Sequence, residues 1–202
     1  KDERLRYFKT GGLDMVKNWN FGLSKVNGSN ILILEDKIRL DKLALQRLKC
    51  ILDKYPENDI ITWNYNLPHS NNLNRISTYD VLNKYLYSKQ IPNIEALPRM
   101  INSVVRTSLI NEILYKSTEK NFFSYVSPDI TAGWKLLTKV NSFINTNERI
   151  GYLFDVSQIN EKTSHGIAAH SGKNYNYYGF NYHKLPLRTI CKSTNIISNV
   201  VY

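Results

Sequence analysis

The spacing of apolar residues predicts alternating helices and strands over the first third of the chain. Apolar residues spread through 13–27 indicate a helix, and Ile31 to Leu34 form a continuous apolar run, which is typical of a buried parallel strand. Apolar residues recur at helical spacing over 41–55, and 60–65 has the composition of a strand. With a short strand expected over 4–9, the order is β-α-β-α-β. This order predicts an α/β fold with a largely parallel sheet.

The rest of the chain has a less regular pattern, and its elements are predicted from local composition. In chain order the predicted segments are a loop over 66–78, a helix over 78–87, a core-facing helix over 99–115, a strand at 122–125, a helix over 132–140, a strand over 149–156, a loop or lid over 161–182, and a C-terminal tail over 186–202. Trp19 and Trp63 are expected in the core.

The length of 202 residues and a hydrophobic content of 42% suit one domain with a packed core. No apolar run approaches the length of a membrane span, and we expect no signal segment because the opening residues are polar. Cys50 and Cys191 fit no metal-ligand spacing. Free thiols in a reducing, cytoplasmic setting are the simpler interpretation, and one disulfide is the alternative.

The formal net charge of +10 suggests an anionic partner. The basic residues are scattered and form no nucleic-acid-binding signature, so we expect no sequence-specific nucleic-acid binding. Weak attraction to a polyanionic surface, such as the periphery of an acidic membrane, is compatible with this charge. A basic domain associated with nucleic acid remains as an interpretation that rests on net charge alone.

An acidic corner, Glu35 and Asp36 followed by Lys37, comes directly after the apolar run 31–34. Ligands bind at the carboxyl ends of strands in open α/β sheets, and adjacent carboxylates suit a hard divalent cation and its phosphates. Acidic residues also favour a helix N-terminus, so capping of the next helix explains the same pair. The residues alone leave both interpretations open.

Several short motifs occur in an order and spacing that resemble family-2 glycosyltransferases with the GT-A fold. They are Asn18-Trp-Asn-Phe-Gly-Leu23 with Val26-Asn-Gly28, Ile31-Leu-Ile-Leu-Glu-Asp-Lys37, Leu97-Pro-Arg99 with Asn102-Ser-Val-Val-Arg106, Phe122-Phe-Ser-Tyr-Val-Ser-Pro-Asp129 with Thr131-Ala132, and, more weakly, Ser157 with Ser164-His-Gly166. The resemblance implies a GT-A-like, mostly parallel sheet flanked by helices over 1–185. It also implies that the family's N-terminal nucleotide-binding strands have no counterpart here.

The resemblance implies an inverting transferase of the hexosyltransferase type, which moves a sugar from a nucleotide-sugar donor to a glycan or related acceptor. Asp36 and Glu35 would face a divalent metal, Mn²⁺ or Mg²⁺, and the donor diphosphate. Lys37 stands where the family places a carboxylate. An ammonium group cannot ligate a metal, but it can pair with a diphosphate itself.

Asp129 is the candidate general base, because Pro128 presets a helix start whose N-terminus keeps the carboxylate ionised. A plain helix cap is the alternative role for Asp129. His165 and His170 are candidates to reach the diphosphate, and ordinary surface histidines are the alternative.

Aromatic residues supply the candidate acceptor site. Trp134, Tyr177 and Tyr178, with Tyr175 nearby, can stack on a sugar, and several aromatics in one predicted loop suggest a binding surface. For Trp134, a position in the core is the alternative.

A non-catalytic glycosyltransferase-like module that binds a glycan or a protein partner is the main alternative function. Lys37 and the lack of the family's opening strands favour it. A homo-oligomer, or a partner chain that supplies the missing strands, is compatible with either function.

Overall fold

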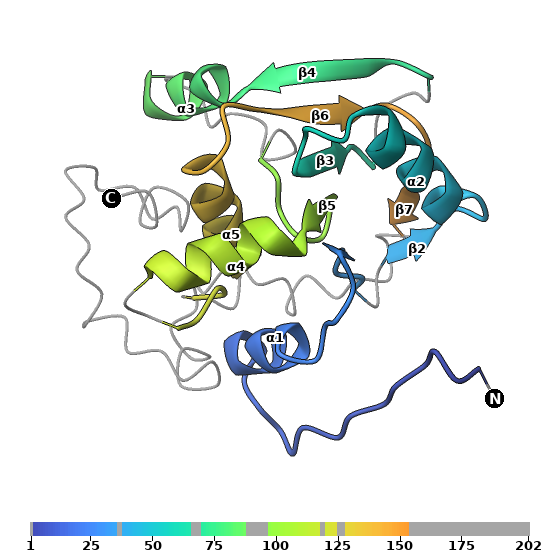
Figure 1. Cartoon of the computed structure of the whole chain (residues 1–202), viewed down its shortest axis with the longest axis vertical. Coiled ribbons are helices and arrows are strands. Elements are labelled where there is room, and N and C mark those ends of the chain that lie inside the picture. Colours follow the sequence, from blue (N-terminus) through green and yellow to red (C-terminus); the bar gives the residue numbers. More distant parts are fainter. Residues whose placement is uncertain are drawn as a thin grey trace.

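The computed structural model describes residues 2–35, 38–65, 70–87, 97–117, 120–124 and 128–153. Over these residues the chain is an α/β protein with five helices, a mixed five-stranded sheet and a separate two-stranded ribbon (Figure 1). The helices are α1 Met15–Leu23, α2 Ala44–Lys54, α3 Thr78–Tyr87, α4 Thr107–Lys116 and α5 Pro128–Leu137. The strands are β1 Asn30–Ile31, β2 Ile38–Leu40, β3 Ile60–Trp63, β4 Leu73–Ser77, β5 Ser103–Arg106, β6 Ser142–Thr146 and β7 Gly151–Leu153.

The main sheet has the order β1-β5-β3-β6-β4. Only β3 and β6 are parallel among these described strands, while the β1–β5, β3–β5 and β4–β6 pairs are antiparallel. The prediction of a mostly parallel sheet is therefore wrong, although the α/β class is confirmed. β1, β3 and β6 do point the same way, since β1 and β3 both oppose β5 and β3 is parallel to β6. The antiparallel character comes from β5, inserted between β1 and β3, and from β4 at the far edge.

Helices cover both faces of the sheet, with α4 and α5 on one face and α2 on the other (Figure 1). Successive residues of the central strands alternate between the two cores, as the two-residue period of a strand requires. Ile60, Val105 and Phe143 pack with α4 and α5, whereas their neighbours Ile61, Val104 and Ile144 pack with α2. This burial on both faces explains why β3 is apolar at nearly every position.

Several predicted helices are confirmed. α2 and α3 lie within 41–55 and 78–87, α1 lies within 13–27, and α5 begins near the predicted turn at Pro128. α1 is capped by Asp14, whose carboxylate accepts a hydrogen bond from the Lys17 amide at 2.8 Å.

Several predictions of strands and loops are wrong. The predicted loop 66–78 contains β4, and the first part of the predicted helix 99–115 is β5. β6 had no counterpart in the prediction. Residues 4–9 form no strand, and neither do 122–124, the described part of the predicted strand 122–125. Only the first residue of the run 31–34 belongs to β1. The predicted strand 149–156 is represented by β7, and its end lies outside the described residues.

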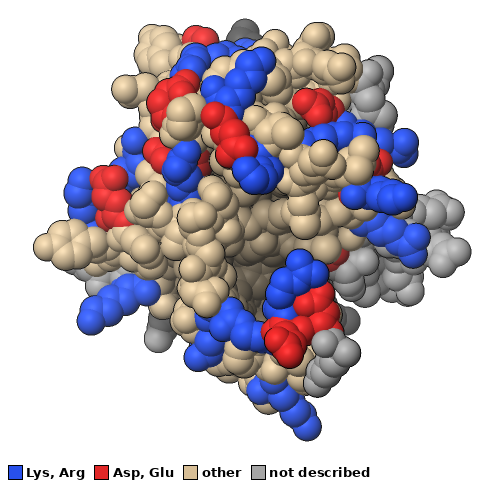
Figure 2. All heavy atoms as spheres, turned by 45° about the vertical axis from the view of Figure 1, so that its right-hand side comes forward, with Lys and Arg blue, Asp and Glu red and all other residues tan. Residues whose placement is uncertain are grey.

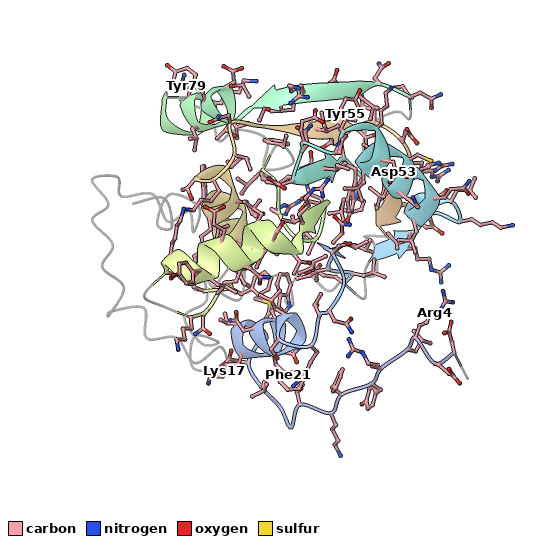
Figure 3. All side chains as sticks on the ribbon, viewed as in Figure 1. Arg4, Lys17, Phe21, Asp53, Tyr55 and Tyr79 are labelled. Carbon is pink, nitrogen blue, oxygen red and sulfur yellow. The ribbon has the colours of Figure 1, made fainter. Side chains whose placement is uncertain are left out.

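The N-terminal segment runs along the outside of α1 (Figure 3, where Arg4 and Phe21 are labelled). Leu5 and Tyr7 are 73% and 91% exposed. Its described contacts to the body are few: Arg6 donates to the Lys25 carbonyl at 2.6 Å, and Phe8 meets Phe21 edge-on. Residues 2–9 are all exposed, and no residue of α1 is fully buried.

The ribbon places β2, directly after the acidic corner, against β7 in an antiparallel pair. Ion pairs connect one end of this ribbon to α2. Arg47 on α2 contacts Asp41, which follows β2, at 3.1 Å and Glu148, which lies shortly before β7, at 3.8 Å. In the part of the chain that the structure describes, no helix is both long enough and apolar enough to cross a bilayer.

Candidate functional site

Four polar residues from separate parts of the sequence lie near one end of the main sheet, where β1 and β3 terminate. The carboxyl ends of β1 and β3 lie at the same edge as the amino end of β5, because β5 runs antiparallel to both. Glu35 follows β1, Tyr65 follows β3, and Arg99 precedes β5. The Ile33 amide donates to the Met100 carbonyl at 3.2 Å, which holds the chain before Glu35 against the segment that carries Arg99.

Asp129 joins this edge from the first turn of α5. Its Oδ2 atom lies 3.6 Å from Nη1 of Arg99, and the two side chains are 19% and 17% exposed. Because α5 begins at Pro128, Asp129 lies inside the first helical turn and is not the residue that precedes the helix. A carboxylate at this place also interacts favourably with the helix dipole.

The charges of Arg99 and Glu35 both act on the phenol of Tyr65. Burial raises the pKa of its phenol to about 12, the Trp63 side chain and the Arg99 guanidinium lower it, and the Glu35 carboxylate raises it further. The phenol O–H donates to the Ile101 carbonyl, so the phenol is neutral and anchored at neutral pH. Since both charges act on one phenol, Glu35 and Arg99 lie in the same electrostatic neighbourhood.

The segment before β5 is a tight turn. Its hydrogen bonds hold the backbone from which the Arg99 side chain extends. The Arg99 amide donates to the Leu97 carbonyl at 2.8 Å, and the Arg99 carbonyl accepts from the Asn102 amide at 3.0 Å and from the Ser103 hydroxyl. These bonds occupy the backbone of Arg99 and leave its guanidinium to reach Asp129.

Gly133 allows α5 to approach this turn. A Cβ added to Gly133 would lie 2.7 Å from Cγ of Leu97, which is completely buried. A side chain at position 133 would therefore push the helix that carries Asp129 away from the turn that carries Arg99. The missing side chain of Gly133 sets the spacing between the two charged residues.

Polar atoms at this edge lack partners. Nε of Arg99 and Oδ1 of Asn64, the residue between β3 and Tyr65, are both buried without a hydrogen-bond partner. Buried polar groups are nearly always hydrogen-bonded, and an exception commonly marks a water, an ion or a ligand. This end of the sheet thus contains one buried donor and one buried acceptor whose hydrogen-bonding capacity is unused.

Of the predicted site residues, Asp129 forms an ion pair with Arg99, and Glu35 acts on Tyr65 as Arg99 does; the roles of both carboxylates stay predictions. Trp134, on α5, is partly buried and packs against the core that contains α4 and α5, and its role in acceptor binding stays a prediction. The other predicted residues lie outside the described residues: Asp36, Lys37, His165, His170, Tyr175, Tyr177 and Tyr178.

The metal prediction is not settled by the residues that are described. Of the predicted ligands only Glu35 is among them, and they contain no group of three or more His, Cys, Asp or Glu side chains that could hold an ion. A metal site here would therefore need ligands from beyond the described ranges.

The surface charge is mixed: lysines and arginines are interspersed with acidic residues on the face shown in Figure 2.

Sequence reasoning missed the roles of Arg99 and Tyr65. Arg99 stood within Leu97-Pro-Arg99, which the resemblance places on the acceptor side, but it had no role of its own assigned, and Tyr65 was the end of a predicted strand. The signal for Tyr65 was its place just beyond a buried apolar strand. Arg99 had no such signal, because the strand that it precedes was predicted as helix.

Comparison with protein-family models found no match, and comparison with curated protein sequences found none either.

Proposed function

We propose that the chain is a GT-A-type glycosyltransferase domain, which moves a sugar from a nucleotide-sugar donor to a glycan or related acceptor with inversion. The observation that supports this most is the ion pair between Arg99 and Asp129, at the end of the sheet where Arg99 and Glu35 both act on the Tyr65 phenol. These carboxylates come from the acidic corner and the Pro-Asp motif, which the resemblance assigns to the two sides of the reaction.

On the donor side, the leaving nucleoside diphosphate gains negative charge that cations must balance. In this proposal Glu35 and Asp36 hold a divalent metal, Mn²⁺ or Mg²⁺, which supplies part of that balance. Lys37 pairs with the diphosphate as a further positive charge.

On the acceptor side, Asp129 accepts the proton of the attacking hydroxyl. Its distance of 3.6 Å from Arg99 is longer than a hydrogen bond, so the carboxylate keeps lone pairs for an incoming proton. Arg99 positions this carboxylate and offsets its charge before the acceptor arrives. The half-buried setting limits competition from water.

A non-catalytic glycosyltransferase-like module is the second candidate, and one observation favours it. β1, the strand before the acidic corner, lies at the edge of the described sheet and pairs with β5 alone. In a catalytic domain we expected this strand to be central, with further strands beside it for the nucleotide.

Calorimetry with UDP-, GDP- and dTDP-sugars, with and without Mn²⁺, separates the two candidates. The catalytic proposal expects binding of one of these donors, strengthened by Mn²⁺. If no nucleotide sugar binds under either condition, the catalytic proposal fails. Glycan binding that persists in the same preparation would then support the non-catalytic module.

A further inference from the structure

Arg99 uses little of its hydrogen-bonding capacity in the described structure. Its guanidinium carries five N–H donors. In the described structure the Arg99 side chain has one ion-pair partner, Asp129 at 3.6 Å, and its Nε is buried without a hydrogen-bond partner. A buried donor without a partner is unfavourable, so this arrangement calls for a further group at the site.

Three arginines elsewhere in the described structure have closer structural partners. Arg47 contacts Asp41 at 3.1 Å, Arg75 contacts Glu57 at 2.7 Å, and Arg106 donates to the Pro56 carbonyl at 2.6 Å. These contacts fasten helices and strands to one another. Arg99 fastens no element this closely, and it lies beside a candidate catalytic carboxylate.

The ion pair with Asp129 does not use the Nε side of the guanidinium. The ion pair with Asp129 uses Nη1, while Nε belongs to the other side of the planar group. Two adjacent N–H groups of a guanidinium match the oxygens of a carboxylate or a phosphate. The chain's net charge of +10 would also raise the local concentration of anionic ligands.

We infer that Arg99 binds an anionic group, a phosphate or a carboxylate, carried by the acceptor. Arg99 contacts Asp129, which faces the acceptor hydroxyl in the proposed reaction, so the anion that Arg99 binds belongs to the acceptor and not to the donor. This inference rests on the proposed function. It adds the substrate class: a sugar acid or a phosphate-bearing acceptor, rather than a neutral glycan.

The test follows the arginine Nε–Hε signals of the full chain by NMR during titration with sn-glycerol 3-phosphate, glucuronate, glycerol, glucose and UDP. The inference expects the Arg99 signal to shift with the two anionic acceptor analogues and not with glycerol or glucose. Arg99→Gln should weaken binding of these analogues about tenfold or more, because the substitution removes both the positive charge and the two adjacent N–H groups of the guanidinium. Arg75→Gln, which removes the same charge on β4, should leave their affinity unchanged.

Other outcomes overturn the inference. It fails if no anionic analogue binds, or if Arg99→Gln binds them as the wild type does. It also fails if Arg99→Gln weakens UDP binding alone, since Arg99 would then serve the donor. If Arg99→Gln does not fold, Arg99→Lys takes its place, and retention of full affinity for both analogues by that variant would contradict recognition by the guanidinium fork.

The proposed function can fail separately. If no nucleotide sugar binds while the anionic analogues bind in an Arg99-dependent way, the anion site stands and its assignment to an acceptor is overturned.

Discussion

The side-chain amide of Asn20 bonds both backbone groups of Phe123: Nδ2 donates to the carbonyl oxygen at 2.8 Å, and the Phe123 amide donates to Oδ1 at 3.1 Å. Trp19 meets the same phenylalanine ring edge-on, with the ring centroids 5.1 Å apart. α1 has no fully buried residue, so these contacts are a main attachment of the helix to the core. The segment 120–124 leads toward the first turn of α5, where Asp129 lies.

Replacement of Asn20 by leucine should destabilise the fold. The substitution removes two hydrogen bonds to Phe123 and leaves partly buried backbone groups without partners, so we expect the free energy of unfolding to fall by about 1–3 kcal/mol. Urea denaturation followed by circular dichroism measures this. Asn18→Leu is the matched control, because Asn18 lies on the exposed face of the same helix. Equal losses in the two variants would contradict the proposed attachment.

Gly133→Ala should also destabilise the protein. The new methyl group would lie 2.7 Å from Cγ of Leu97, and the overpacking should cost about 1–3 kcal/mol in thermal or urea unfolding. Gly22→Ala is the opposite case: nothing lies within 4 Å of its added Cβ, so the better helix propensity of alanine should stabilise α1 by up to about 1 kcal/mol. In a double-mutant cycle, Leu97→Ala should relieve part of the cost at position 133. Strict additivity would show that the two residues do not clash.

Tyr65 should make stability fall at high pH. Burial raises its pKa from 10.0 to about 12, so between these values the unfolded chain loses the phenol proton while the folded chain keeps it. The contribution is fully present below pH 10 and is lost toward pH 12, with a slope of up to about 1.4 kcal/mol per pH unit. Urea midpoints measured across this window should fall less steeply in Tyr65→Phe. Tyr79→Phe, which removes a phenol that is 71% exposed, should keep the wild-type slope.

Glu35 and Asp129 should affect different steps. Under the proposed function, Glu35→Gln weakens Mn²⁺-dependent donor binding about tenfold or more, as seen when metal sites are perturbed. Asp129→Asn leaves donor affinity nearly unchanged and lowers the transfer rate by about 10²–10⁴, the usual contribution of a general base. Calorimetry and product analysis read the two effects. Asp80→Asn, in the first turn of α3, controls for loss of a similarly placed carboxylate; a transfer rate as low as that of Asp129→Asn would refute a specific role for Asp129.

The pattern of apolar residues was sufficient to predict the elements in which these residues recur most regularly. The helical spacing over 41–55 and the apolar run from Ile60 both correspond to elements of the structure, because burial of one helix face or of a central strand imposes these patterns. The common direction of β1 and β3 also follows the predicted order. The roles of Glu35 and Asp129 come from the resemblance and stay predictions.

What the sequence did not reveal depends on pairing between distant segments. Ile101, Val104 and Val105 have helical spacing and run directly into α4, so β5 was read as helix. Its strand form comes from pairing with β1 and β3 on either side. Since Arg99 reaches the site only because β5 starts at that edge, its role was hidden by the same error. β4 was missed because an edge strand needs few apolar residues.

The strand order has a consequence for how the protein folds. In the described main sheet, no strand pairs with the strand of this sheet that is next to it in sequence. β1 pairs with β5, and β3 pairs with β5 and β6. Chains that depend on such long-range pairings lose the entropy of closing large loops before the paired strands gain stabilising contacts. Such chains fold slowly. Glu35, Tyr65, Arg99 and Asp129 come from four of these separated stretches. These four residues therefore come together only after the long-range strand pairings have formed.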